Sequence, residues 1–418
     1  MSDALVSAMR MAMPKRLPLA VHIDLLARCD LNCTHCYLSV RRAPGLSTDR
    51  YLQLLDELHD ANVLHLLFSG GEIFLRDDTL QILRRARQLR FLVKLITHGG
   101  RITDEIADAL AEMGIAEVGI SLYSMVPEHH EAVTRIKGSH ARTLAGIRRL
   151  RARDVAVQLK VTAMQANRDS WHTVRPWGQE AGCLVSESNE VYAKDDFDAE
   201  HVERMNLNWE ERVAAASHQL AVRRDQDGLV AYPDSPGARL EDPPCTAGQT
   251  SCYINPEGKV YPCAIFYSEV GDITRQSFRE IWEDSPALHK IREVSKLSFH
   301  ECQDCRFIAD CNHCLAQQFQ ATGDMLARSP LICTDTHARF AAAAELNLYD
   351  GVVEPPPHGI GVPSRPPCAS DTAMIGAGGE GCDSCGPSEA AGAAFSESAF
   401  PAGLAPEEVP DLLALAVR

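Results

Sequence analysis

The chain has 418 residues, and its 45% hydrophobic and 23% charged side chains are typical of a globular protein large enough for two or three domains. No apolar run approaches the roughly 20 residues that span a bilayer, and the first residues lack the pattern of an export signal. We therefore expect a cytoplasmic protein with no membrane partner. The net charge of -16 argues against a nucleic-acid partner, which would require a basic patch.

Between about residues 18 and 200, segments with strand character alternate with segments of helical periodicity. The predicted strands are 19–26, 63–72, 91–100, 116–124 and 155–164, and the predicted helices are 48–62, 76–89, 103–114 and 140–154. This alternation predicts an α/β fold with right-handed βαβ units around a parallel sheet, either doubly wound or closed into a complete or partial barrel. In each case, ligands gather at the carboxyl ends of the strands.

The rest of the chain has a different composition. A helix is predicted over 203–225, followed by a Pro- and Gly-rich linker, a cysteine-rich α+β unit and an acidic tail rich in Pro, Gly and Ala. The tail cannot bury enough apolar area to offset its ordering entropy, so we expect it to be disordered. The predicted divisions are an N-terminal extension 1–17, an α/β domain 18–200, a helix and linker 201–240, a cysteine-rich domain 241–349 and the tail 350–418.

Fifteen cysteines are many for a protein in a reducing compartment, where structural disulfides are not expected. Metal binding is the natural explanation for the eleven that fall into patterns. Of the other four, Cys183 lies in the apolar segment "AGCLVS" and is expected in a core. We expect the tail thiols Cys368, Cys382 and Cys385 to be solvated.

The first pattern, C-x3-C-x2-C, places Cys29, Cys33 and Cys36 directly after the first predicted strand. Three thiolates from one tight loop can converge on a metal centre but cannot enclose it. Structural zinc usually takes four ligands, whereas a 4Fe-4S cluster held by three cysteines keeps one iron position open. A zinc knuckle on an α/β domain is the alternative.

The same loop carries a family resemblance. With His35 before the third cysteine and Ser69-Gly70-Gly71-Glu72 about 30 residues later, residues 18–200 resemble the radical S-adenosylmethionine (SAM) enzymes. The resemblance implies a partial (β/α)6 TIM-like barrel with a SAM-binding 4Fe-4S cluster in the first βα loop. It also implies reductive cleavage of SAM to a 5'-deoxyadenosyl radical, chemistry that belongs to the cofactor.

The resemblance also implies a set of SAM-binding residues. Gly70 and Gly71 suit close backbone approach to a ligand, Ser69 precedes them, and Glu72 would accept a hydrogen bond from the SAM amino group. His35 stands where the family places an aromatic residue near the adenine. The remaining candidates are the strand-end hydroxyls Thr97 and Ser121, although His98 replaces the usual Asn and Ser121 lacks the Asp common two positions later.

A second cysteine set occupies the downstream unit. It consists of Cys245-x12-Gly258-x4-Cys263, then Cys302-x2-Cys305-x5-Cys311-x2-Cys314, and finally Cys333. The segment "CYINPEGKVYPC" predicts a hairpin with Cys252 and Cys263 at its ends. Because C-x2-C pairs suit zinc as well as iron–sulfur clusters, two zinc ribbons are the alternative.

This second set resembles the SPASM auxiliary-cluster domain, except that only Asn312 and His313 separate the last pair where the family has three residues. The resemblance implies two auxiliary 4Fe-4S clusters. One would be held by Cys245, Cys252, Cys263 and Cys314, and the other by Cys302, Cys305, Cys311 and Cys333. Ligation by four cysteines favours electron relay over substrate binding.

The two-domain layout resembles that of the radical SAM/SPASM maturases, oxidoreductases that crosslink or otherwise oxidise ribosomally made and post-translationally modified peptides (RiPPs). The implied partners are a peptide or protein substrate and a low-potential electron donor such as flavodoxin or ferredoxin. Only about 20 residues precede the barrel, too few for a fused peptide-binding module, so a separate leader-peptide-binding protein is a further candidate partner. The alternatives are an anaerobic sulfatase-type protein maturase and, in another class, an iron–sulfur electron-transfer protein.

Overall fold

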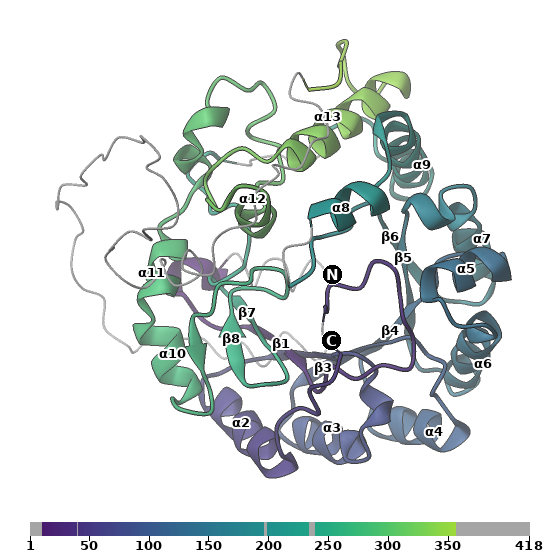
Figure 1. Ribbon diagram of the computed structural model, residues 1–418, viewed down its shortest axis with the longest axis vertical. Coiled ribbons are helices and arrows are strands. Elements are labelled where there is room, and N and C mark those ends of the chain that lie inside the picture. The colour runs from purple at the N-terminus through teal and green to yellow at the C-terminus, as the bar shows by residue number, and fades with distance from the viewer. Residues whose placement is uncertain (1–10, 40, 196–198, 234–238, 357–418) are drawn as a thin grey trace.

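One sheet of nine strands forms the arc seen in Figure 1, in the order β6-β5-β4-β3-β2-β1-β7-β8-β9. The computed structural model describes residues 11–39, 41–195, 199–233 and 239–356. Strands β1 to β7 pair in parallel, whereas β8 and β9 are antiparallel to their neighbours. The strands are β1 Ala20–Asp24, β2 His65–Ser69, β3 Leu92–Thr97, β4 Glu117–Ser121, β5 Val157–Thr162, β6 Leu184–Ser188, β7 Ser251–Ile254, β8 Lys259–Tyr261 and β9 Gly271–Asp272.

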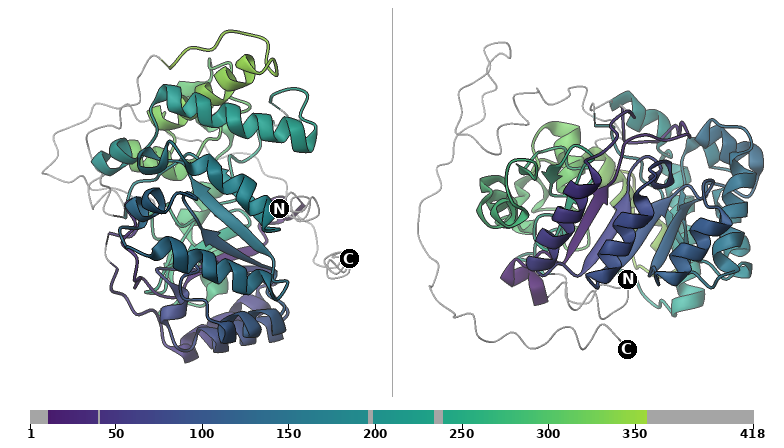
Figure 2. Two further views of the ribbon diagram at one scale, coloured as in Figure 1. Left: turned by 90° about the vertical axis from the view of Figure 1, so that its right-hand side faces the viewer. Right: turned by 90° about the horizontal axis from the view of Figure 1, so that it is seen from below.

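The helices that follow β1 to β5 cover the outer face of the arc (Figure 2). This arrangement confirms the predicted α/β fold of the partial-barrel type. The helices are α2 Thr48–Asp60, α3 Thr79–Gln88, α4 Asp104–Glu112, α5 Pro127–Thr134, α6 Ser139–Arg151, α7 Val174–Glu180, α8 Ala199–Met205, α9 Trp209–Asp227, α10 Phe278–Asp284, α11 Pro286–Arg292, α12 Leu315–Thr322 and α13 Pro330–Glu345. Within the described residues, none of these helices is long and apolar enough to cross a membrane.

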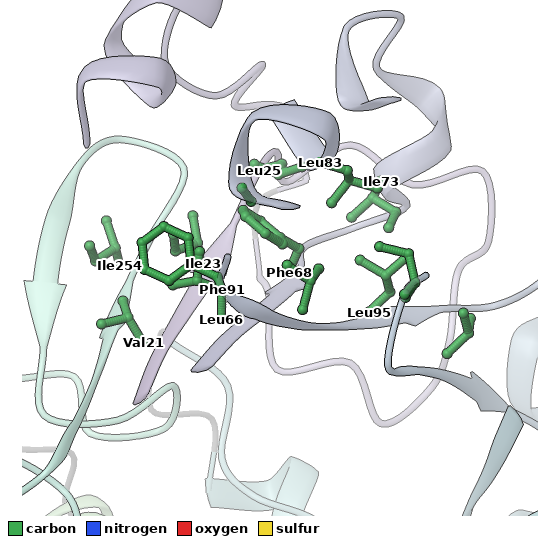
Figure 3. Packing of buried hydrophobic residues seen from close by; sticks show 14 of the residues in the cluster. Val21, Ile23, Leu25, Leu66, Phe68, Ile73, Leu83, Phe91, Leu95 and Ile254 are labelled. Atoms are coloured by element: carbon green, nitrogen blue, oxygen red, sulfur yellow. The ribbon is translucent and has the colours of Figure 1, made fainter. Parts of the chain in front are cut away.

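The alternation of residue types along the strands explains which face is covered. Outward side chains such as Val21, Ile23 and Phe68 are completely buried against the helices, where they form the main hydrophobic core (Figure 3). Inward side chains of the same strands are more polar, as His22 and Lys94 illustrate, and they remain partly exposed. Because successive strand residues point to opposite faces, the sequence gives the barrel an apolar outside layer and a polar interior.

The prediction of one helix over residues 203–225 was wrong, because two helices occupy this region. Helix α8 ends at Met205, and α9 begins at Trp209. Asn208 is the N-cap of α9. Its side chain accepts a hydrogen bond from the backbone N–H of Glu211, and the Glu211 carboxylate accepts one from the backbone N–H of Asn208. This reciprocal capping fixes a helix start at this point.

The hairpin of the cysteine-rich unit continues the barrel sheet. Strand β7 pairs in parallel with β1, with Ala20 opposite Ser251 and Ile23 opposite Ile254. The predicted turn is present between β7 and β8, where the Asn255 side chain accepts two backbone N–H bonds. The first cysteine loop and the second cysteine set are therefore joined through one pair of neighbouring strands. The tail cysteines and most of the predicted disordered tail lie outside the described residues.

Helices α9 and α13 lie side by side (Figure 1) and enclose a buried ion network. The Arg212 side chain is completely buried, lies 3.5 Å from Asp335, and donates to the Leu207 carbonyl at 3.0 Å and the Asn206 side chain at 2.8 Å. Asp335 also pairs with Arg339 at 3.2 Å. Removing one member of such a network leaves other polar groups buried without partners.

We predict that Arg212→Ala destabilises the chain by roughly 3–5 kcal/mol, because it removes the buried cation and leaves its acceptors, among them the Asp335 carboxylate, without this partner. The measurement is the melting temperature of anaerobically purified protein, which we expect to fall by several degrees. Arg224→Ala on the same helix is the matched control, because Arg224 is exposed and its ion-pair partner among the described residues is its neighbour Asp225. Equal melting temperatures for the two variants would contradict a structural role for Arg212.

Candidate active site and cofactor centres

The first cysteine loop, residues 29–36, is fixed from two sides by the chain itself. The backbone N–H groups of Asn32 and Thr34 donate to carbonyl oxygens at the end of α5, at 3.0 and 2.8 Å. From the other side, the Arg41 guanidinium donates to two loop carbonyls at 3.1 Å each. These contacts bring the loop to the carboxyl end of β1, where the fold predicts a ligand site.

The three thiols of this loop are partly buried and lie close to one another. Burial raises the pKa of Cys29 to about 11 and that of Cys33 to about 12, and it also raises the pKa of Cys36. The charges of Cys36 and Cys29 raise the pKa of Cys33 further, so the three sulfur atoms are neighbours. Soft donors that release their protons to a bound cation fit an iron–sulfur cluster.

The Ser69-Gly70-Gly71-Glu72 segment packs against the chain just before the cysteine loop. A Cβ atom on Gly71 would lie 2.0 Å from the Arg28 carbonyl oxygen, and Gly70 has a φ of +139°. The N–H groups of Gly71 and Glu72 donate to the carbonyls of Leu26 and Arg28 at 2.8 Å each. We expected these glycines to approach a ligand; in the structure their close contact is with the backbone that leads into the cysteine loop.

Glu72 is completely buried, and its carboxylate is surrounded by donors. The Thr97 hydroxyl lies 2.8 and 2.7 Å from its two oxygens, and the backbone N–H of His98 donates at 3.0 Å. Thr97, predicted to face the cofactor, is therefore engaged with Glu72. The hydrogen bond from SAM to Glu72 remains a prediction. The structure adds the donors that hold the Glu72 carboxylate in place.

His98, which replaces the usual Asn, connects Glu72 to the cysteine loop. Its Nε2 atom lies 2.8 Å from Asp30 and 3.1 Å from Glu72. Burial lowers the pKa of His98, but the hydrogen bond with Asp30 and the charge of Glu72 outweigh it and raise the pKa above its ordinary value. The Nδ1 atom of His98 accepts from the backbone N–H of Gly100 at 3.0 Å, so its Nε2 atom is the one turned toward the two carboxylates.

His35 and Tyr123 form a second contact with the cysteine loop. The Nε2 atom of His35 lies 3.2 Å from the Tyr123 hydroxyl, and burial lowers the pKa of His35 to about 4. The neutral ring leaves its buried Nδ1 atom without a hydrogen-bond partner among the described residues, as a ring facing a bound ligand would. Ser121, two residues before Tyr123, is half-buried at the end of β4. No motif in the sequence indicated Tyr123 separately.

Asp24 is a site residue that the sequence analysis missed. It is completely buried at the end of β1, and it accepts hydrogen bonds from Tyr37 at 2.6 Å and from Tyr253 at 2.8 Å. His22 Nε2 lies 3.2 Å from its other oxygen. Tyr37 follows the last loop cysteine and Tyr253 lies on β7, so one carboxylate joins the cysteine loop, the barrel and the hairpin. The available signal was a lone acidic residue in the apolar run "HIDLL".

A basic cavity of about 650 Å³ opens beside the cysteine loop. Cys33 and Thr34 form part of its wall, and no acidic side chain is present among the described residues that line it. The described residues also supply no ion-pair partner to Arg42, Arg135 or Arg204, all of which are exposed. The basic and histidine side chains of the wall are Arg41, Arg42, Arg135, Lys194, His201 and Arg204. In a chain with a net charge of -16, this concentration of positive charge favours anionic ligands.

The downstream thiols fall into two neighbourhoods. One contains Cys302, Cys305, Cys311 and Cys333. Burial, together with the smaller effect of the other three thiols, raises the pKa of Cys333 to about 12. The other contains Cys245, Cys263 and Cys314, which affect one another in the same way. Cys252 lies apart from both groups, in the main core of the barrel.

Comparison with known proteins identifies both parts of the chain. Residues 23–172 match the Radical SAM superfamily, and residues 245–306 match the SPASM family, an iron-sulfur cluster-binding domain. The AdoMet-dependent heme synthase of Methanosarcina barkeri is 29% identical over 75% of this chain and 95% of its own length. The PqqA peptide cyclase of Streptomyces rochei is 27% identical over 80% of this chain and 95% of its own length.

The fold also matches solved structures. The crystal structure of Streptococcus suis SuiB bound to S-adenosylmethionine superposes with a TM-score of 0.60 at 15% identity, covering 77% of this chain and 79% of that one. The two family matches assign SAM and a 4Fe-4S cluster to the barrel, and auxiliary iron–sulfur binding to the downstream unit. The residues around the first cysteine loop fit these cofactors. The chain therefore belongs to the radical SAM superfamily, as an enzyme with a SPASM auxiliary-cluster domain.

Proposed function

We propose that this enzyme acts on a ribosomally made peptide, from which it removes hydrogen at carbon to install a crosslink or another oxidative modification. The similarity to a PqqA peptide cyclase over nearly the whole of that protein supports a peptide substrate. On this chain, the observation that carries the proposal is the basic cavity beside Cys33. An acidic segment of a peptide would pair with Arg42, Arg135 and Arg204, to which the described residues supply no ion-pair partner, and would lie next to the cofactor site.

The cysteine loop and its surroundings would hold the cofactors. Cys29, Cys33 and Cys36 would ligate the SAM-binding cluster. The SAM contacts would come from His35, Ser69, Gly70, Gly71, Glu72, Thr97 and Ser121. Given an electron from a low-potential donor such as flavodoxin or ferredoxin, the bound cofactors supply the one-electron chemistry that breaks an unactivated C–H bond.

The chain's own side chains would then position the reactants. The Thr97 hydroxyl, which lies within hydrogen-bond distance of both Glu72 oxygens, and the backbone N–H of His98 hold Glu72 in one orientation, so that this carboxylate is pre-organised for a cationic partner. The arginines of the cavity would orient the substrate by its carboxylates. A separate leader-peptide-binding protein would deliver the peptide to this face.

A second candidate is a carboxylate-bearing tetrapyrrole. The observation that favours it is the 29% identity to an AdoMet-dependent heme synthase, again over nearly all of that protein. The same arginines would bind its carboxylates, so the charge of the cavity alone does not separate the two substrates. Direct binding measurements with each class of ligand distinguish the two substrates.

We predict that Cys33→Ala abolishes SAM cleavage, because two thiolates from this loop would not hold the cluster. The measurement is 5'-deoxyadenosine release under anaerobic conditions with SAM and dithionite, together with iron content. We expect no product and a loss of about four irons per chain, with the downstream iron retained. Cys183→Ala is the matched control, because Cys183 is a buried core thiol away from the loop, and it should leave both quantities unchanged. Product release by Cys33→Ala would refute the cluster assignment.

We also predict that the double variant Arg42→Glu/Arg204→Glu weakens binding of an acidic peptide at least tenfold, equivalent to about 1.4 kcal/mol. The measurement is fluorescence anisotropy of a labelled hexaglutamate peptide, repeated with a dicarboxylate porphyrin. Arg279→Glu is the control, because Arg279 is exposed on α10, where it pairs with Glu283 and donates to the Asp60 carbonyl, and it does not line the cavity. Binding of the porphyrin but not of the peptide would favour the tetrapyrrole as substrate. Unchanged peptide affinity in the double variant would show that the basic cavity does not bind the peptide.

A further inference from the structure

Cys252 differs from the other thiols that the sequence assigns to auxiliary clusters. It lies within β7, opposite Val21 of β1, and only 3% of its surface is exposed. Val21 and Ile254, the residue two positions after Cys252, both belong to the packed core on the helix-covered side of the sheet (Figure 3). Cys252 belongs to the same core.

The pleat of β7 explains this orientation. The next residue, Tyr253, points to the interior of the barrel, where its hydroxyl donates to Asp24 at 2.8 Å and its ring lies 5.1 Å from that of His22. Successive side chains of a strand point to opposite faces. Because Tyr253 is held inside the barrel by two contacts, Cys252 must point outward toward the helices.

The three thiols with which Cys252 was grouped lie elsewhere. Cys263 and Cys314 pack against a separate hydrophobic cluster that contains Phe266 and Phe319. Cys245 lies close enough to act electrostatically on both of these thiols. These three sulfur atoms therefore share one neighbourhood.

The surroundings of Cys252 contain a cation in place of thiols. Among the described residues, Arg292 is the charged group that lies close enough to act electrostatically on Cys252. The Arg292 guanidinium lies over the Trp282 ring at 4.6 Å and donates to the Gly248 carbonyl at 2.8 Å. A cation held in this way packs between the strand and α10.

We propose that the auxiliary cluster of Cys245, Cys263 and Cys314 is ligated by only these three thiolates, and that Cys252 is a core residue. One iron position of that cluster is then not filled by a cysteine. Such a position accepts an exogenous donor, for example an oxygen, nitrogen or sulfur atom of the substrate. This assignment changes the expected role of the cluster from electron relay to ligand binding, and it holds for either substrate class considered above.

The test uses the full chain with Cys29, Cys33 and Cys36 replaced by Ala, so that only the auxiliary clusters remain. In this background, Cys252→Val should keep the iron content and the electron paramagnetic resonance spectrum of the dithionite-reduced clusters. Val cannot ligate iron and suits a buried strand position, and Cys252→Ala is a second variant should Val disturb the packing. Cys245→Ala is the matched variant of a proposed ligand and should lose one cluster, about four irons per chain.

The open position is tested in the same background with ¹³C-labelled cyanide as the probe. We expect hyperfine coupling of cyanide to one reduced cluster, of equal strength with and without Cys252→Val. Loss of about four irons, or the signal of a three-iron cluster, in both the Val and the Ala variants would overturn the exclusion of Cys252. Unchanged iron without cyanide coupling would overturn the open position, because a fourth ligand would then come from the chain. Neither readout depends on SAM cleavage or on a peptide.

Discussion

The close backbone contact between Gly71 and the Ala27–Arg28 segment is the constraint on which the rest of the site depends. A side chain at Gly71 would collide with main-chain oxygen atoms at 2.0 and 2.5 Å, which cannot move without displacing the start of the cysteine loop. The contact ties the end of β2 to the end of β1. It thereby places Glu72 beside the loop that carries the three thiols, and the His98 bridge between Asp30 and Glu72 offsets the cost of burying that carboxylate.

A second connection extends this arrangement to the downstream unit. Asp24 accepts from Tyr37, next to the loop, and from Tyr253 on the hairpin, so a shift of the hairpin would be transmitted to the cysteine loop. The same contact to Tyr253 fixes the orientation of β7 and turns Cys252 away from the other thiols. Asp24 therefore connects the cysteine loop with the strand on which Cys252 lies.

Much of the barrel could be predicted because its strands carry local information. Segments such as "VHID" and "LVKLIT" alternate apolar and polar residues, and the helices between them carry caps such as Ser47 and Thr103. β6 was not predicted as a strand, since "LVSES" is short and Leu184 is 61% exposed on its inward face. The break between α8 and α9 was missed because helical periodicity continues through Asn208, whose capping role depends on a side-chain conformation.

The cysteine loop, the Ser69–Glu72 segment and the two downstream cysteine groups were visible as motifs, because their spacing is local. The spacing of the cysteines could not predict toward which face of the sheet each side chain points. The contact of Asp24 with Tyr253 joins residues 229 positions apart in the sequence, and the orientation of Cys252 follows from that long-range pairing. The basic cavity likewise combines residues from the cysteine loop, the end of α5 and α8, which only the folded chain brings together.

The central claim is that three thiolates at the end of β1 hold an iron–sulfur cluster to which SAM binds directly. Electron paramagnetic resonance of the dithionite-reduced wild-type chain, recorded before and after addition of SAM, tests it most directly. We predict that the signal of one cluster shifts on addition of SAM while the auxiliary signals stay in place. A spectrum in which no signal responds to SAM would contradict it.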